Sequence, residues 1–261
     1  MEERKRSFDK VVQAYDRRRP RYVPELFDAI SQFARLTPDS RLLEVGCGTG
    51  QATEPFLNRG CSVTAVELGK NMAVYVKEKF RNFPNFHVFN QPFEEFEGEE
   101  GEYDLLYSAT AFHWIAPETG YPKALRLLKP GGTLALFWTR PTLAPNQPLT
   151  REINALYAGK YARYFPPDEA KKPESRGRLF EKIQREIECF GFTELSFQLF
   201  HGTRVMTGRE YAELLDTYSD HRTLEEPVKR EFYHAVQSAI ESHGDRLELL
   251  DTMDLYLARK P

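Results

Sequence analysis

The stretch LLEVGCGTGQ, residues 42–51, decides the fold of this chain. An apolar run, Arg41–Val45, leads into glycines at positions 46, 48 and 50, and a helix-like segment follows. Glycine tolerates the backbone angles of a tight strand-to-helix turn, and its missing side chain lets a ligand lie against the backbone and the helix N-terminus. The pattern therefore predicts a nucleotide-like ligand at the carboxyl end of a β-strand, although a purely structural turn explains a glycine-rich loop equally well.

An acidic residue, Glu67, stands at the end of the next apolar run, Ser62–Val66. A carboxylate at that point accepts hydrogen bonds from both hydroxyls of a ribose. Two features separate the loop from the dinucleotide fingerprint GxGxxG: Gln51 replaces the last glycine, and Glu44 lies inside the end of the first strand. A carboxylate there repels a pyrophosphate and attracts a cationic amino group, so the loop favours a positively charged ligand over NAD.

Strand-like and helix-like segments alternate around the loop, which predicts a parallel sheet with crossover helices. The chain opens with helical periodicity through Tyr15, and a second helix begins at Pro24. The KPGG sequence, residues 129–132, is a stop signal between a helix and the next strand. The apolar positions of the first helix are Phe8, Val11, Val12 and Tyr15, and the expected strands are Arg41–Val45, Ser62–Val66, Asn85–Phe89, Tyr103–Ser108, Thr133–Trp138, Leu195–Leu199 and a last one around Leu249–Leu257.

The composition of the chain changes beyond Arg140. A proline-rich stretch, 141–150, is followed by four aromatic residues and then by a polar stretch, 166–178. We interpret this region as a lid or specificity insertion. The four aromatic residues are Tyr157, Tyr161, Tyr164 and Phe165. In this interpretation they line an acceptor pocket, whereas a simple packed helix explains them equally well.

Length and composition exclude several classes of protein. The chain has 261 residues, 41% of them hydrophobic and 29% charged, which is typical of a globular protein and not of a disordered one. A net charge of -3 argues against a dedicated nucleic-acid binder, and no apolar run approaches the roughly 18 residues that span a bilayer. The three scattered cysteines, Cys47, Cys61 and Cys189, form neither a disulfide framework nor a CxxC metal site, so we expect a cytoplasmic protein without a metal.

Together these motifs resemble the class I S-adenosylmethionine-dependent methyltransferases over about residues 40–140. The resemblance rests on LLEVGCGTG, Glu67, NQPF (90–93), YDLLYSATAFHW (103–114) and LLKPGG (127–132). The AFHW signature and the opening YDRRRPRY (15–22) are similar to the trans-aconitate methyltransferase-like branch, which acts on small molecules.

The resemblance implies an α/β fold: a doubly wound, seven-stranded, mostly parallel sheet with the last strand antiparallel, plus helical lid insertions. A single methyltransferase domain, 1–261, would contain an N-terminal helical cap (1–38), a cofactor-binding core (39–140), a lid insertion (141–180) and a C-terminal part of the sheet with a helical insertion (181–261). The expected cofactor is S-adenosylmethionine.

Cofactor contacts follow from the same resemblance. The three glycines, Gly46, Gly48 and Gly50, would lie against the methionine moiety and the ribose, with Glu44 at the amino end and Glu67 on the ribose hydroxyls. Met72 is equally explained as a core residue, and Arg19 as one charge in a solvated run. The other implied contacts are Leu68 and Met72 on the adenine face, Gln91, Pro92 and Phe93 around the adenine amino group, Ser108 and Ala109 under the sulfonium, and Tyr15 and Arg19 as a cap.

The acceptor is expected to meet His113, Trp114 and Arg140. His113 is the candidate base, because histidine transfers protons near neutrality, although a packed histidine would give the same sequence. A carboxylate acceptor needs no base, and Arg140 is placed to bind one, with a surface charge as the alternative. We therefore expect a methyltransferase for a small-molecule acceptor, by O-methylation if the acceptor is a carboxylate. The alternatives are an NAD-dependent oxidoreductase and a catalytically silent cofactor-binding module.

Overall fold

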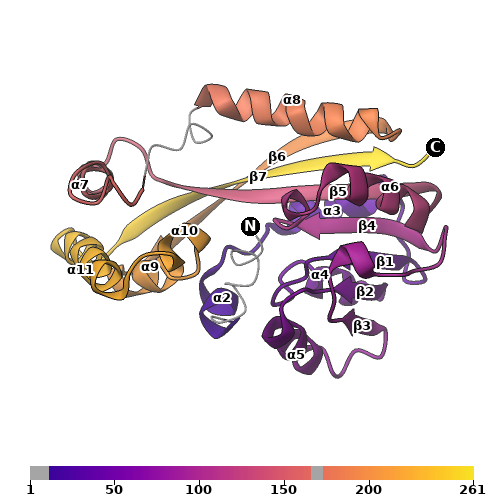
Figure 1. Cartoon of the computed structure of the whole chain (residues 1–261), viewed down its shortest axis with the longest axis horizontal. Coiled ribbons are helices and arrows are strands. Elements are labelled where there is room, and N and C mark those ends of the chain that lie inside the picture. Colours follow the sequence, from indigo (N-terminus) through magenta and orange to yellow (C-terminus); the bar gives the residue numbers. More distant parts are fainter. Residues whose placement is uncertain (1–11, 166–172) are drawn as a thin grey trace. The chain divides into compact units, whose positions relative to one another are not determined.

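The computed structural model describes residues 12–165 and 173–261. Within these residues the chain forms one seven-stranded sheet in the order β3-β2-β1-β4-β5-β7-β6 (Figure 1). The strands are β1 (Arg41–Val45), β2 (Ser62–Val66), β3 (Phe86–Phe89), β4 (Tyr103–Ala109), β5 (Leu128–Leu143), β6 (Thr193–Met206) and β7 (Leu247–Arg259).

The strands pair in parallel from β3 through β5. β7 runs antiparallel to β5, because Gly131 donates to the carbonyl of Lys260 while Ala144 donates to that of Glu248. The predicted doubly wound sheet with an antiparallel last strand is thus confirmed. The order of the strands reverses between β1 and β4, and in open α/β sheets ligands bind at the carboxyl ends of the strands at such a point.

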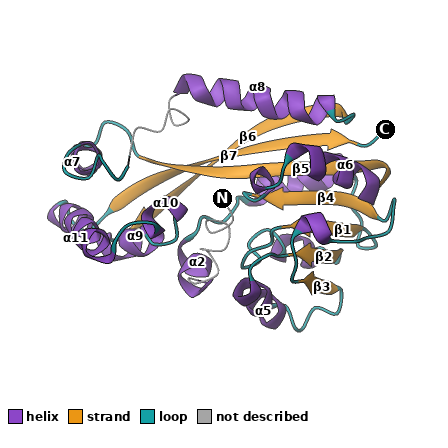
Figure 2. Cartoon of the chain, in the orientation of Figure 1, coloured by secondary structure: helices purple, strands orange, loops and turns teal. Residues whose placement is uncertain are grey.

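Helices connect the strands, as the alternating pattern predicts (Figure 2). Three of them begin with a proline, which suits the first turn of a helix: Pro24, Pro117 and Pro148. The helical elements are α2 (Val12–Arg18), α3 (Pro24–Ala34), α4 (Glu54–Leu57), α5 (Lys70–Lys79), η2 (Phe93–Glu95), η3 (Phe112–Trp114), α6 (Pro117–Leu127), α7 (Pro148–Ala158), α8 (Pro173–Cys189), α9 (Gly208–Leu215), α10 (Ser219–Arg222) and α11 (Glu226–Ser242). Of the predicted first helix, Phe8 and Val11 lie outside the described residues.

The sequence predicted that the KPGG segment, residues 129–132, separates a helix from the next strand. In the structure this segment lies inside β5. Tyr103 pairs with Leu128, but Leu105 already pairs with Thr133, so the ladder between β4 and β5 is irregular across this segment. Gly131 has φ 73, a backbone angle that glycine favours. The turn residues therefore produce a bulge inside β5 and do not end the element.

The chain packs into two compact units. The core unit comprises Arg21–Thr139, Phe180–Phe200 and Met253–Pro261, and the helical unit comprises the described parts of Met1–Pro20, Arg140–Leu179 and His201–Thr252. The predicted single domain, with its cap, core and lid boundaries, stays a prediction. Across the described ranges, no helix is both long and apolar enough to cross a membrane.

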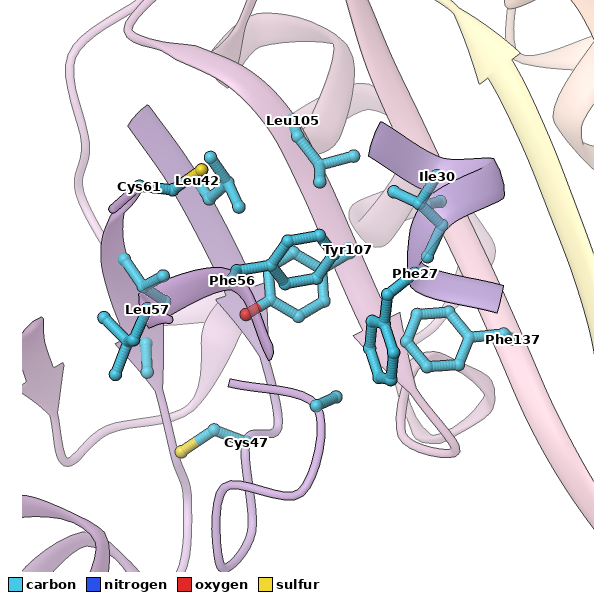
Figure 3. Packing of buried hydrophobic residues seen from close by; sticks show 14 of the residues in the cluster. Phe27, Ile30, Leu42, Cys47, Phe56, Leu57, Cys61, Leu105, Tyr107 and Phe137 are labelled. Carbon is cyan, nitrogen blue, oxygen red and sulfur yellow. The ribbon is translucent and has the colours of Figure 1, made fainter. Parts of the chain in front are cut away.

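Aromatic residues dominate the packing on one side of the sheet in the core unit (Figure 3). The ring of Phe56 lies 5.5 Å from that of Phe27 and 4.8 Å from that of Tyr107, measured between centroids. Phe27 in turn packs edge-on against Phe137 of β5. These contacts hold α3 and α4 against β4 and β5, and they fix the strand ends that carry the site.

In the helical unit, Phe232 of α11 is the centre of a second aromatic cluster. The rings of Tyr157, Tyr161 and Phe165 lie 4.9, 4.8 and 5.1 Å from it. Tyr161 is buried, and Tyr157 and Phe165 are half-buried. Only Tyr157 lies in a helix, α7, so these residues pack against Phe232 without forming one helix face, and their role as a pocket wall stays a prediction.

Candidate active site

The glycine loop after β1 has the geometry that its sequence predicts. Gly46, Gly48 and Gly50 have φ values of 73, 55 and 83, in the left-handed region that glycine favours. A Cβ atom on Gly46 would lie 2.4 Å from Cβ of Ala111, and one on Gly50 would lie 2.4 Å from the ring of Phe80. Both positions therefore need glycine for the turn and for the close approach of neighbouring elements.

Glu67 binds the loop directly. Its Oε2 accepts a hydrogen bond from the backbone N–H of Gly48 at 2.8 Å, and its Oε1 accepts one from the N–H of Gly69 at the same distance. The side-chain amide of Asn90 donates a hydrogen bond to the backbone carbonyl oxygen of Glu67 at 2.9 Å. An ionised carboxylate has about four acceptor positions, which is more than these two N–H groups use.

Glu44 is fully buried beneath the same loop. Its Oε2 accepts hydrogen bonds from Thr53 Oγ1 at 2.5 Å and from the hydroxyl of Tyr107 at 2.9 Å. Its Oε1 has no hydrogen-bond partner among the described residues. Burial raises the pKa of Glu44 to about 7, and the charge of Glu67 adds to the effect. A buried, unsatisfied carboxylate oxygen of this kind fits a ligand that brings a cationic amino group.

This environment predicts a pH-dependent stability for the protein without ligand. Because the pKa of Glu44 is higher in the folded than in the unfolded chain, the folded state binds more protons between about pH 4.5 and 7. The free energy of unfolding should therefore fall across this window as pH rises, by about 3 kcal/mol relative to Glu44→Gln. Urea unfolding of both proteins between pH 4.5 and 8 measures the difference, and parallel curves would contradict the burial effect.

The end of β4 carries backbone strain beside the loop. Thr110 has φ 57, which is rare for a β-branched residue. Its N–H donates to the carbonyl of Phe137 at 2.8 Å, and its Oγ1 lies 3.0 Å from the hydroxyl of Tyr22. The hydroxyl of Ser108 donates to the carbonyl of Val45, so it ties β4 to β1, and the sulfonium contact expected of Ser108 and Ala109 stays a prediction.

The predicted adenine side follows β2 and β3. Met72 and Phe93 are buried, whereas Leu68, Gln91 and Pro92 are half-buried. Their contact with adenine stays a prediction, and for Met72 the burial is equally consistent with core packing. Sequence reasoning missed Phe89 at the end of β3, a large apolar side chain that is 46% exposed.

His113 lies in η3, directly after the end of β4. Its Nδ1 accepts a hydrogen bond from Trp138 Nε1 at 3.0 Å, and its ring packs against that of Trp114 at 4.9 Å. Trp138 is buried and packs edge-on against Tyr256. The sequence predicted His113 and Trp114 but not Trp138.

Three predicted contacts, Tyr15, Arg19 and Arg140, belong to the helical unit. The guanidinium of Arg19 lies over the rings of Tyr15 and Tyr218 at 4.9 and 4.4 Å and donates to the carbonyl of Thr217. Arg19 is therefore packed within its unit and is not a solvated charge. The cap and the substrate contact expected of these three residues stay predictions. No cluster of three metal-ligating side chains occurs in the portion of the chain that the structure describes.

Comparison with known proteins identifies the family. Residues 43–136 match the methyltransferase domain family. An uncharacterized methyltransferase of Mycobacterium tuberculosis is 33% identical over 51% of this chain, which spans about half (51%) of that relative's length.

Two further proteins extend the comparison. The trans-aconitate 2-methyltransferase of Deinococcus radiodurans is 33% identical over 69% of this chain and 57% of its own. A Haemonchus contortus phosphoethanolamine N-methyltransferase, solved with phosphomonomethylethanolamine and S-adenosylhomocysteine, covers 98% of this chain and 60% of its own, with a TM-score of 0.56 and 17% identity. The sequence match and the sheet topology agree with the resemblance seen in the sequence, and residues 43–136 form a class I S-adenosylmethionine-dependent methyltransferase domain.

Proposed function

We propose that this protein transfers the methyl group of S-adenosylmethionine to a carboxylate oxygen of a small-molecule acid. The observation that carries the proposal is the pair of acidic side chains at the glycine loop. Glu67 is held by the N–H groups of Gly48 and Gly69 where a ribose is expected, and Glu44 offers a buried, unsatisfied oxygen where a cationic amino group is expected. A ligand with a ribose at one end and an ammonium at the other satisfies both.

The residues of the core unit fit S-adenosylmethionine as cofactor. Gly46 and Gly50 leave no room for a Cβ beside Ala111 and Phe80, so they hold the loop in its tight turn. Glu67 would bind the ribose, and Glu44 would bind the amino group. When bound, the cofactor supplies a methyl group activated by the positive sulfur. The protein then has to align the acceptor oxygen with that methyl group and to exclude water.

A carboxylic acid is supported as acceptor by its chemistry. Such an acid is ionised near pH 7, so its oxygen attacks without a base. The candidate base of the sequence, His113, has its Nδ1 occupied by the N–H of Trp138. The trans-aconitate 2-methyltransferase relative is named for a small-molecule acid, which agrees with the proposal.

Product analysis tests this function. The protein should be incubated with S-adenosylmethionine labelled in the methyl group and with a panel of trans-aconitate, citrate, malonate, a phenol and a primary amine. We expect label in a methyl ester of one of the acids, recognised because mild alkali releases it as methanol. Transfer to the phenol or the amine alone would contradict the carboxylate acceptor.

The same purified protein tests the two alternatives, an oxidoreductase and a catalytically silent cofactor-binding module. Calorimetric titration with S-adenosylmethionine and with NADH distinguishes a methyltransferase from a nicotinamide-dependent oxidoreductase, and binding of NADH alone would contradict the proposal. Binding of S-adenosylmethionine without labelled product from any acceptor or from a cell extract would favour a catalytically silent module.

A further inference from the structure

Trp138 determines which nitrogen of His113 carries the hydrogen. The indole Nε1–H of tryptophan is a donor only, so His113 Nδ1 must accept the hydrogen bond of 3.0 Å that joins them. In the neutral ring the hydrogen then resides on Nε2. A proton on Nδ1 would face the indole N–H and break this bond.

We propose that His113 serves as a hydrogen-bond donor that binds the carboxylate of the acceptor through Nε2–H, and that Trp138 is the positioning residue that maintains this tautomer. The proposal rests on the carboxylate acceptor proposed above. It differs from the base role that the sequence suggests, because a ring nitrogen that already carries a hydrogen cannot take another from the acceptor.

The position of Trp138 is itself rigid. Trp138 lies on β5 and is only 7% exposed, and its ring meets that of Tyr256 at 5.8 Å and 81°. Tyr256 packs in turn on Phe197 and Phe180, at 5.1 and 5.8 Å. These contacts leave the indole little freedom, so its N–H stays directed at the imidazole.

The location of His113 relative to the glycine loop makes this donor useful. Ala111, two residues before His113, lies so close to Gly46 that a Cβ on that glycine would come within 2.4 Å of it. The turn η3 therefore starts at the loop that is expected to bind the methionine moiety of the cofactor. His113 is also exposed, so an acceptor can reach it.

The proton balance of the reaction agrees with His113 as a hydrogen-bond donor and not as a base. One oxygen of the acceptor carboxylate forms a bond to the methyl carbon as the carbon–sulfur bond breaks, and the bonding electron pair remains on the sulfur. The carboxylate becomes a neutral ester and the sulfonium becomes a neutral thioether, so no proton moves. A hydrogen bond from Nε2–H to the other carboxylate oxygen orients the attacking one.

Three variants separate the donor from the base. His113→Gln retains an oxygen that can accept from Trp138 and an N–H that can donate to the acceptor, but it cannot take up a proton near neutrality. His113→Phe lacks both groups. Trp138→Phe keeps a ring beside Tyr256 and removes the N–H. Tyr121→Phe is the matched control, because it removes a hydroxyl that donates to Glu186 and keeps a ring that packs on Phe112 of the same turn.

Steady-state kinetics are measured at saturating S-adenosylmethionine, with the acid that the wild type methylates as the varied substrate. His113→Gln stays within about threefold of the wild type in kcat and KM, whereas His113→Phe raises KM for the acid about 10- to 100-fold. Trp138→Phe raises it about tenfold, and Tyr121→Phe leaves it unchanged. A loss of kcat in His113→Gln as large as in His113→Phe, with KM unchanged, would assign the base role and overturn the inference.

A spectroscopic readout does not depend on activity. In protein labelled with ¹⁵N-histidine, two-bond ¹⁵N–¹H spectra report which ring nitrogen carries the hydrogen, and His113→Gln identifies the signal. We expect hydrogen on Nε2 in the wild type and a mixture of tautomers in Trp138→Phe; hydrogen on Nδ1 in the wild type overturns the inference. The proposed function fails on a different observation: the wild type binds S-adenosylmethionine but forms no ester from any acid. In that case His113 has no carboxylate acceptor to bind, whichever tautomer it adopts.

Discussion

Glu67→Ala is expected to weaken the binding of S-adenosylmethionine about 100-fold. The variant loses the carboxylate that would bind the ribose and also the two hydrogen bonds from Gly48 and Gly69 that hold the loop in shape. Hydrogen bonds to a charged group contribute about 1.5 to 3 kcal/mol each, so the net loss of one of the two ribose contacts already accounts for about one to two orders of magnitude. Isothermal titration calorimetry measures the affinity.

Two further variants make the result interpretable. Glu78→Ala removes an acid of the same type that forms an exposed ion pair with Arg81, and it should leave the affinity unchanged. Glu67→Gln keeps the size of the side chain but directs an amide N–H at one of the two backbone donors, so its affinity should be nearly as low as that of Glu67→Ala. An affinity of Glu67→Ala equal to that of the wild type would mean that the ribose binds elsewhere.

Gly46→Ala should lower the free energy of unfolding by about 2 to 4 kcal/mol and abolish methyl transfer. The new Cβ would lie 2.4 Å from Cβ of Ala111, and the residue would have to keep φ 73. The positive φ costs an alanine about 1 kcal/mol, and the overlap forces the loop and the end of β4 apart, which adds to the cost. Urea unfolding gives the loss of stability, and the labelled-methyl assay gives the loss of activity.

Gly101→Ala is the control for the backbone strain. Gly101 has φ 67, but no atom lies within 4 Å of the position that its Cβ would take. This variant should therefore lose only about 1 kcal/mol and keep its activity. Equal losses of stability in the two variants would show that the contact with Ala111 relaxes at no cost, which contradicts the close approach described above.

The sequence predicts those features of the site that are local in the chain. β1 and β2 have the predicted bounds, because strands buried on both faces form continuous apolar runs. The glycines and Glu67 are recognisable for a similar reason, since a tight turn and the acid after the next strand have a regular spacing. Side chains that meet through the sheet are not visible in this way.

Glu44 illustrates the limit. Its partner Tyr107 lies opposite it in the ladder between β1 and β4, so the hydrogen bond exists only because of the register of that pair. Trp138 likewise reaches His113 through the pairing of β4 with β5. Both contacts join residues far apart in sequence, and no local pattern marks Tyr107 or Trp138 as anything but an apolar strand residue.

The backbone strain at Thr110 makes this position a target for stabilising substitutions. A β-branched residue held at φ 57 costs the fold about 1 to 3 kcal/mol, and the contacts with Tyr22 and Phe137 offset that cost. Selection for thermostability alone would replace this residue by glycine or asparagine. Consensus or computational stabilisation of this enzyme is therefore expected to propose changes at position 110, and activity is the property such changes put at risk.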